Sequence, residues 1–457
     1  MIASRIRTWR PVPLTWLSMG SDADAPSTVR HTEPDALHNL TAVLQLCAAG
    51  TLRCSEKTRR PSAATVRAVA ETLVGGDFYS DDAIASFAWP LLVQAGGLAR
   101  LEGSRLALTP KGRKALDRPR HEVIRDIWGR WPRHAPIDEL SRVEQIKGQR
   151  SAAALSAAGP RRQTVAAALD LCPPDEWVEV DELFAAMRRA GLHPGVARSE
   201  RGLWKLYLLD PEYGSLGYAG FHDWPILEGR YTLAVLFEYA ATLGLLDVEY
   251  GPPAHARDDF RHMWGADEFD ALSRYDGLHG VRLTALGAYA IGLTASYVPT
   301  EPAVAERTLE VLANHDVVAT ADLAPGDRLV LDAFAARTSD RVWTLSTASL
   351  LGAVDAGRTP EELGTFLDER AAHAVPDTVR RLLSDVEARA AQVRDLGPRR
   401  VLECADASVA ALLAGDRSLR GLCTRLGERH LMLDPAGEAK ARTALRKLGY
   451  PLGPTSR

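Results

Sequence analysis

The order of apolar and polar positions repeats between two stretches of the chain. Each has an apolar run of helical length, a Gly-Leu pair that opens a short strand with a Glu near its end, a second strand, and the pattern Leu-Thr-x-x-Gly-x-x-Ala. The first copy covers residues 87–116 and the second covers residues 227–290. Thr109 and Thr284 stand where a hydroxyl can accept a free backbone N–H of the next helix. The pattern therefore predicts helix, strand, strand and helix twice, with a short turn in the first copy and a long loop in the second.

A helix followed by a two-stranded ribbon is how a winged-helix unit ends, and we expect two related units of this kind. A solenoid would need more copies at a fixed period. Two unrelated hairpins remain the alternative interpretation. In a DNA reader of this type, the helix before the ribbon enters the major groove, and that helix is predicted at residues 81–95 and 227–243. The expected fold class is α+β, mainly helical, with tandem winged-helix units.

The segments around the two copies suggest where the domains begin and end. Residues 1–120 are interpreted as an N-terminal arm, docked by Trp9 and Trp16, followed by the first winged-helix unit. Residues 121–162 are interpreted as a basic helical connector. Residues 163–297 are interpreted as the second winged-helix unit, with a long wing.

Prolines within residues 299–326 mark a third boundary, and a C-terminal domain is expected over residues 325–457. A short apolar helix is predicted near residues 308–313, and a strand at residues 328–331. The pattern then predicts two helices, the first opened by Thr359 and Pro360, and two short strands. These lie at residues 359–370, 376–391, 401–404 and 431–433.

The C-terminal domain resembles the helicase-associated domain of actinobacterial XPB-type helicases. The resemblance rests on a Leu-x-x-x-Ser-Leu pattern, a Glu-Glu-Leu-x-x-Phe-Leu helix, a Pro-led helix and a Leu-Gly-Tyr end, at residues 345–350, 361–367, 375–379 and 448–451. The upstream region is similar to the winged-helix units that accompany this domain in relatives without a helicase. The resemblance implies a helicase-associated α+β domain that works with a helicase or nuclease. The helicase motor itself is missing from this sequence.

Composition places the chain among ordinary globular proteins, and a length of 457 residues suggests about three domains. The net charge of −4 argues against a uniformly basic coat. Residues 100–162, however, hold 15 Lys and Arg against 7 Asp and Glu, a charge of +8 that leaves −12 for the remainder. A phosphate-binding face and a solvated linker would both show such a charge. Five scattered cysteines, no signal peptide and no run of about 20 apolar residues predict a cytoplasmic protein with reduced thiols and no membrane span.

The motifs do not combine into a catalytic site. The chain has no Gly-Lys pair, so the phosphate loop of a helicase is not predicted. The glycines of residues 214–220 lack the strand–turn–helix setting of a dinucleotide site and fit a turn-rich connector. The His and Asp residues of the loop 251–280 have no metal-ligand spacing and fit a charged wing tip. We therefore expect no enzyme activity, no catalytic residue, no cofactor and no metal.

Basic residues of the first hairpin predict a DNA contact, because Lys and Arg neutralise phosphates. The predicted DNA-binding side chains lie on the first ribbon, on the helix after it and on the second groove helix: Arg100, Arg105, Lys111, Arg113, Lys114 and Arg230. The groove helices carry few cations, so we expect binding without sequence readout.

The expected function is a non-enzymatic DNA-associated accessory protein that acts with a helicase or nuclease in DNA repair or anti-phage defence. The alternative is a protein–protein adaptor. An apolar, weakly charged groove helix would also suit a winged helix that docks a partner protein without touching DNA.

Overall fold

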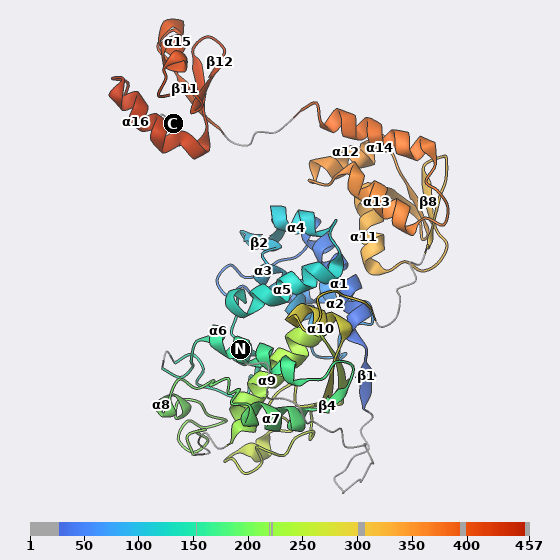
Figure 1. Ribbon diagram of the computed structural model, residues 1–457, viewed down its shortest axis with the longest axis vertical. Helices are drawn as coiled ribbons and strands as arrows, with labels where there is room; N and C mark the ends of the chain where they lie inside the picture. Colours follow the sequence, from blue (N-terminus) through green and yellow to red (C-terminus); the bar gives the residue numbers. More distant parts are fainter. Residues whose placement is uncertain are drawn as a thin grey trace. The chain divides into compact units, whose positions relative to one another are not determined.

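The computed structural model describes residues 27–151, 153–218, 220, 223–299, 307–393 and 399–452. The arm predicted to dock by Trp9 and Trp16 lies outside the described residues. The chain divides into two compact units, Met1–Ser384 and Asp385–Arg457. Helices predominate and the sheets are small and antiparallel (Figure 1), so the α+β prediction is confirmed.

The first predicted hairpin is present, with the predicted helix on each side of it. The elements of this part of the chain are β1 (Thr28–Arg30), α1 (Thr32–Ala48), α2 (Ala63–Ala70), α3 (Ala85–Ala95), β2 (Ala99–Glu102), β3 (Arg105–Leu108), α4 (Pro110–Ala115), α5 (Arg120–His134) and η1 (Glu139–Arg142). Thr109 caps α4, because its hydroxyl accepts the N–H of Gly112 at 3.0 Å. The sequence pattern therefore located both the ribbon and the start of the helix after it.

The second predicted hairpin is also present. The elements are α6 (Ala158–Ala168), η2 (Leu169–Leu171), β4 (Trp177–Glu179), α7 (Val180–Arg189), α8 (Glu200–Leu203), η4 (Pro225–Gly229), α9 (Arg230–Ala234), η5 (Val235–Ala241), β5 (Leu246–Tyr250), η6 (Ala266–Glu268), β6 (Leu278–Leu283) and α10 (Ala285–Ile291). Thr284 caps α10 by accepting the N–H of Gly287 at 2.9 Å. The helix before this ribbon winds as a π-helix over η4 and η5.

The two hairpins share their hydrogen bonds as well as their sequence. In each, the capping threonine also donates its hydroxyl to the carbonyl of the glycine before the first strand. Thr109 reaches Gly97 at 2.8 Å, and Thr284 reaches Gly244 at 2.7 Å. Both glycines have a positive φ, 71° and 74°, a conformation that favours residues without a Cβ. The Gly-Leu and Leu-Thr elements of the repeat thus join the start of the first strand to the end of the second in each ribbon.

The N-terminal strand joins the sheet of the second hairpin. The strand order is β1-β5-β6-β4, and Thr28 of β1 lies opposite Tyr250 of β5. The first hairpin is a separate ribbon, β2-β3, with a single further bridge from Arg53 to Arg105. A strand from before the first hairpin therefore completes the sheet of the second.

One continuous core runs through residues 36–291, and it includes the segment predicted as a connector. The helix predicted there exists as α5, but Val123, Ile127 and Trp131 are completely buried against neighbouring helices. Figure 1 shows α5 between α3 and α10. Its apolar residues recur at helical spacing, so its basic composition conceals a core-facing stripe. The segment predicted as a connector therefore contributes a helix to the core.

The next part contains β7 (Leu309–Val311), β8 (Asp316–Ala319), α11 (Pro325–Phe334), β9 (Ala336–Ser339), β10 (Val342–Thr344), α12 (Thr347–Asp355), α13 (Pro360–Arg370) and α14 (Asp377–Ala390). Its sheet has the order β7-β8-β10-β9. The helix predicted near residues 308–313 is the strand β7, and the strand predicted at residues 328–331 lies inside the helix α11. The predicted boundary at residue 325 also leaves out two strands of this sheet.

The predicted helices after that point are confirmed. Thr359 caps α13 by accepting the N–H of Glu362. The carboxylate of Glu362 does not return to the cap, as a capping box would require, because it forms an ion pair with Arg358. Val379 and Val386 of α14 are buried, as its helical periodicity predicts.

The second unit contains β11 (Arg400–Glu403), α15 (Ala407–Gly415), β12 (Cys423–Leu426), β13 (His430–Leu433), η7 (Pro435–Gly437) and α16 (Glu438–Lys447). The strand order is β11-β13-β12, which confirms the two predicted strands. A small core that includes Leu419, Leu431 and Leu445 holds it together.

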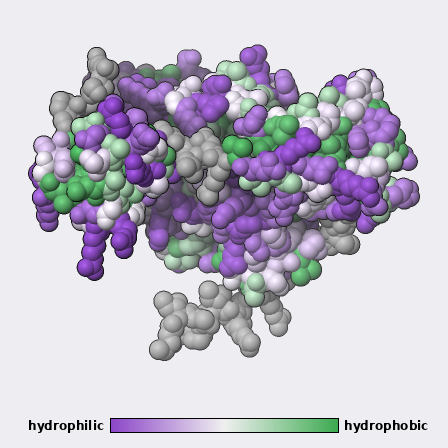
Figure 2. Space-filling view, turned by 90° about the horizontal axis from the view of Figure 1, so that it is seen from above, coloured by the Kyte–Doolittle hydropathy of each residue, from purple (hydrophilic) through white to green (hydrophobic). Residues whose placement is uncertain are grey.

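Hydrophilic residues cover most of the face shown in the space-filling view (Figure 2). Among the described residues, no helix combines the length and the apolar composition that a membrane span requires.

Candidate functional site

The strands of the first hairpin present two arginines to solvent. Glu102 lies opposite Arg105 in the β2–β3 register, and the turn between them passes through Gly103. Arg100 and Arg105 both pair with Glu102, at 3.2 and 3.3 Å, and their side chains remain 67% and 51% exposed. Exposed ion pairs of this kind are weak, because water and salt screen the two charges. Both guanidinium groups can therefore exchange Glu102 for another anion.

A second basic segment lies beside this hairpin. The Cys54 N–H donates to the Ser104 carbonyl at 2.8 Å, and the Leu106 N–H donates to the Leu52 carbonyl at 3.0 Å. These bonds place the loop 51–60 along the ribbon, and the loop carries exposed Arg53, Lys57 and Arg59. We call the set Arg53, Lys57, Arg59, Arg100 and Arg105 the basic face.

The loop 51–60 was missed in the sequence, although four of its ten residues are basic. Its charge was visible there, but its place was not, because a single bridge from Arg53 to Arg105 joins it to the ribbon. Arg60 is not part of the basic face, since its guanidinium donates to Ser141.

The predicted contacts on α4 differ in their availability. Arg113 and Lys114 are exposed near the end of the helix. Lys111 donates to the Gly96 carbonyl at 3.1 Å and lies 4.0 Å from Asp126. Partial burial lowers the pKa of Lys111. Lys111 thus has protein partners already, whereas Arg113 and Lys114 remain exposed on α4.

Arg230 is wrongly placed among the DNA contacts. Its side chain is completely buried, and its guanidinium forms two bonds to Asp276, at 3.1 and 3.0 Å, and one to the Pro225 carbonyl. It also pairs with Asp259. A buried arginine of this kind cannot reach a phosphate, and it instead ties the long loop after β5 to the helix.

The two predicted groove helices are buried as well. Every residue of α3 except Gln94 is buried, and so is every residue of α9 and η5. The two helices pack against each other. Burial on all sides places both helices in the core, so neither helix can enter a groove or dock a partner.

Three arginines of the predicted connector are buried and already form ion pairs with carboxylates. Arg142 bonds Glu238, and Arg162 bonds Glu139 through its Nε at 2.8 and 2.9 Å. Arg161 pairs with Asp138. Burial raises the pKa of Glu139 to about 7, even though Arg162 opposes that shift. The excess charge of residues 100–162 is therefore only partly available at the surface.

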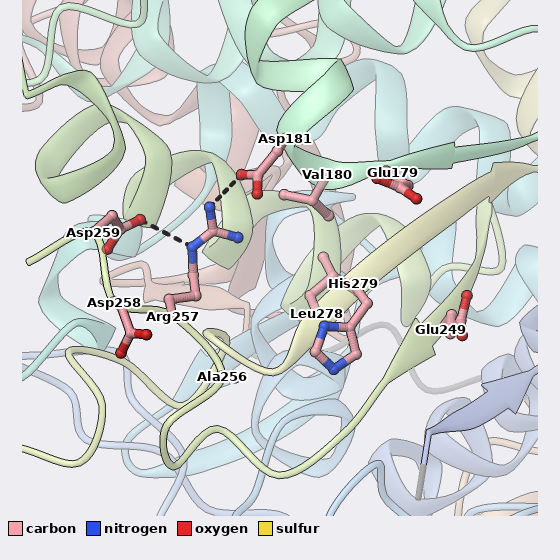
Figure 3. A pocket seen from close by; sticks show the side chains of 10 residues that line it. All are labelled: Glu179, Val180, Asp181, Glu249, Ala256, Arg257, Asp258, Asp259, Leu278 and His279. Carbon is pink, nitrogen blue, oxygen red and sulfur yellow. Dashed lines mark hydrogen bonds and ion pairs between the residues drawn. The ribbon is translucent and has the colours of Figure 1, made fainter. Parts of the chain in front are cut away.

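An acidic cavity of about 540 Å³ lies at the edge of the second hairpin (Figure 3). Glu179, Asp181 and Glu249 line it, and Arg257, which also lines it, pairs with Asp181 and Asp259. His279 also lines the cavity. Burial lowers the pKa of His279, so its imidazole favours the neutral form. The excess of carboxylates disfavours a phosphate ligand. Within the described residues, no group of three or more His, Cys, Asp or Glu side chains is arranged to hold a metal.

The cysteine thiols of the native protein are expected to react slowly. Burial raises the pKa of Cys54 to about 11 and of Cys172 to about 12, and it raises the pKa of Cys47, Cys404 and Cys423 as well. Since the thiolate is the nucleophile, on the order of one Cys54 thiol in a thousand is reactive at pH 8. Titration with a thiol reagent should give no more than one fast thiol, the partly exposed Cys423, and five after unfolding. Two or more fast thiols in the native protein would contradict this expectation.

A comparison with known families matches part of the chain. The family described as helicase conserved C-terminal domain matches residues 309–427, from the first strand of the β7-β8-β10-β9 sheet to β12. A search of curated proteins finds no match. The match supports a helicase-associated domain in the C-terminal part of the chain, and it begins at β7 rather than at residue 325.

Proposed function

We propose that this chain is a non-enzymatic DNA-associated accessory protein that holds the DNA backbone on its basic face. The observation that carries the proposal is the alignment of the loop 51–60 with the first hairpin. Together they gather five exposed cations, with Glu56 and Glu102 as the acidic residues of the two segments. The wing-like ribbon would lie along the phosphates, because such contacts position a protein on DNA without carrying sequence information.

Binding on this face would not depend on sequence. Readout of bases requires side chains that reach base edges in a groove, and the helices that would do this are buried. Phosphate contacts through Arg and Lys supply most of the affinity in such cases, and they make it fall steeply with salt. The proposed winged-helix units would therefore use the wing, and not the helix before it.

The match to a helicase C-terminal domain supports a role beside a helicase or nuclease. We propose that the chain acts there in DNA repair or anti-phage defence. The match covers residues 309–427 and therefore bears on the C-terminal part of the chain.

Neutralising the basic face should weaken DNA binding and flatten its salt dependence. The test variant is R53Q/K57Q/R100Q/R105Q, measured with a labelled random duplex by anisotropy between about 50 and 200 mM salt. Each phosphate contact contributes about 0.9 to the slope of log affinity against log salt. We expect the slope to fall by about 3 to 4 and the affinity near 100 mM salt to fall on the order of tenfold or more.

A matched control removes the same charge elsewhere. Arg188, Arg189, Arg201 and Lys205 are exposed on and near α7 and α8, so R188Q/R189Q/R201Q/K205Q should keep most of the affinity. Equal losses in the two variants would show a general effect of net charge, and unchanged binding in the first would refute the proposed surface.

The adaptor alternative requires a surface other than the helices before each ribbon. Those helices are buried against each other. If the chain recruits a protein, the contact must lie on an exposed surface.

A further inference from the structure

Several large aromatic side chains are exposed on the long loops after α8 and after β5. Tyr213 is 56% exposed and Trp264 is 52% exposed, and their rings lie 5.5 Å apart. Leu209 is 46% exposed and lies beside Gly265, the residue after Trp264. A Cβ added to Gly265 would lie 2.8 Å from the Leu209 side chain. We call Leu209, Tyr213 and Trp264 the Trp264 surface. A second exposed pair, Trp204 and Tyr218, lies in the same loop.

Backbone bonds fix the shape of the loop that carries Tyr213. Its two arms pair through a bridge from Tyr207 to Ser215, so residues 209–213 form the tip. Asp210 closes the tip by accepting the N–H groups of Glu212 and Tyr213, at 2.8 and 3.0 Å. The Trp204–Tyr218 pair lies at the base, on the other side of the bridge from the tip. The two aromatic pairs are therefore separate patches on one ordered loop.

Among the described residues, carboxylates without an ion pair dominate the charge around the Trp264 surface, because the nearby Arg261 and His262 already pair with Asp258 and Asp223. Asp210 and Glu212 belong to the tip, and Asp267 and Glu268 follow Trp264 in η6, with all but Asp210 exposed. The base differs, since Arg201 and Lys205 lie beside Trp204. Aromatic faces within an acidic rim attract cations both through the ring quadrupole and through the carboxylates.

We propose that the Trp264 surface binds an arginine-bearing segment of a partner protein. Tyr and Trp are the residues that most often carry the energy of a protein interface, and an arginine stacks on aromatic rings while its guanidinium reaches carboxylates. A single nucleic-acid strand would also stack on these rings, but it needs a positive groove for its phosphates. The acidic rim favours the cationic peptide.

The test uses the full chain and a fluorescein-labelled peptide of alternating Gly and Arg, eight residues long, followed by anisotropy. Y213A/W264A removes the aromatic faces and leaves the charge unchanged, and it should weaken binding by about tenfold. D267N/E268Q should weaken binding severalfold and reduce its salt dependence. The control W204A/Y218A removes the other exposed pair and should stay within about twofold of the unaltered chain. A Gly-Lys peptide should bind more weakly than the Gly-Arg peptide.

Several outcomes would overturn the proposal. No binding by the unaltered chain would do so, and so would equal losses in Y213A/W264A and W204A/Y218A. Binding of labelled oligothymidine that disappears in Y213A/W264A would assign the surface to single-stranded nucleic acid. A dimer in sedimentation experiments that dissociates in Y213A/W264A would assign it to a second copy of the chain. None of these variants touches the basic face, so the two proposals stand or fall separately.

Discussion

Replacing Arg230 with methionine is expected to destabilise the protein by about 3–5 kcal/mol, the usual cost of breaking a buried ion pair from one side. Arg230 and Asp276 are both completely buried. Without the guanidinium, the carboxylate of Asp276 would keep only the Leu272 N–H, at 3.0 Å, and the Ser273 hydroxyl as donors. Urea unfolding of R230M and the unaltered chain measures the difference, and the unfolding midpoint should fall at an unchanged slope.

Two further variants separate charge from packing. R230M/D276N removes both charges but keeps an acceptor for the Leu272 N–H, and it should recover part of the loss, because an uncharged group is cheaper to bury. R341A breaks the exposed pair between Arg341 and Asp322 and should change stability by about 0.5 kcal/mol or less. If R230M cost no more than R341A, the buried pair would not be holding the loop after β5.

Replacing Gly287 with alanine should cost about 2–4 kcal/mol through overpacking and a disturbed helix cap. A Cβ on Gly287 would lie 2.2 Å from the Leu245 carbonyl oxygen, so the helix and the strand would have to separate. The first hairpin repeats this arrangement, because a Cβ on Gly112 would lie 1.9 Å from the Leu98 carbonyl oxygen. Both G287A and G112A should therefore lower the melting temperature, as followed by circular dichroism.

Gly129 gives the matched control with the opposite sign. It is exposed on α5, where a Cβ added to it would meet no other atom within 4 Å. G129A should stabilise the chain by about 0.5–1 kcal/mol, because alanine loses less conformational freedom in a helix. If G129A and G287A shifted the melting temperature in the same direction and by similar amounts, close backbone approach would not explain the glycine in the repeat.

The hairpins could be predicted from the sequence because their determinants are local. A capping threonine and a glycine three residues later lie within one turn of each other, so the signals for each hairpin lie within its own copy of the repeat. The strand wrongly predicted at residues 328–331 shows the limit of this approach. A short apolar run fits a buried helix as well as a strand, and the helix signals were Pro325 and Asp327 in the first turn of α11.

The candidate site was harder to predict because it depends on contacts between distant segments. The partner of Arg142 is Glu238, 96 residues away, and the partner of Arg230 is Asp276, 46 residues away. Sequence can show that an arginine is present, but not that a carboxylate has already neutralised it. The all-round apolar character of α3 is a usable signal for burial. The position of α3 before the ribbon instead predicts a groove helix.

The position of β1 has a consequence for synthesis of the chain. Residues 28–30 find their partners only at residues 248–250, so this strand leaves the ribosome about 220 residues before the strand it pairs with. At roughly 5–20 residues per second, that delay is about 11 to 44 s. The first hairpin can form within that time, while the segment that will close the second sheet waits with its backbone donors and acceptors unpaired. The sheet of the second hairpin is therefore completed late in synthesis, when β5 emerges and pairs with the waiting β1.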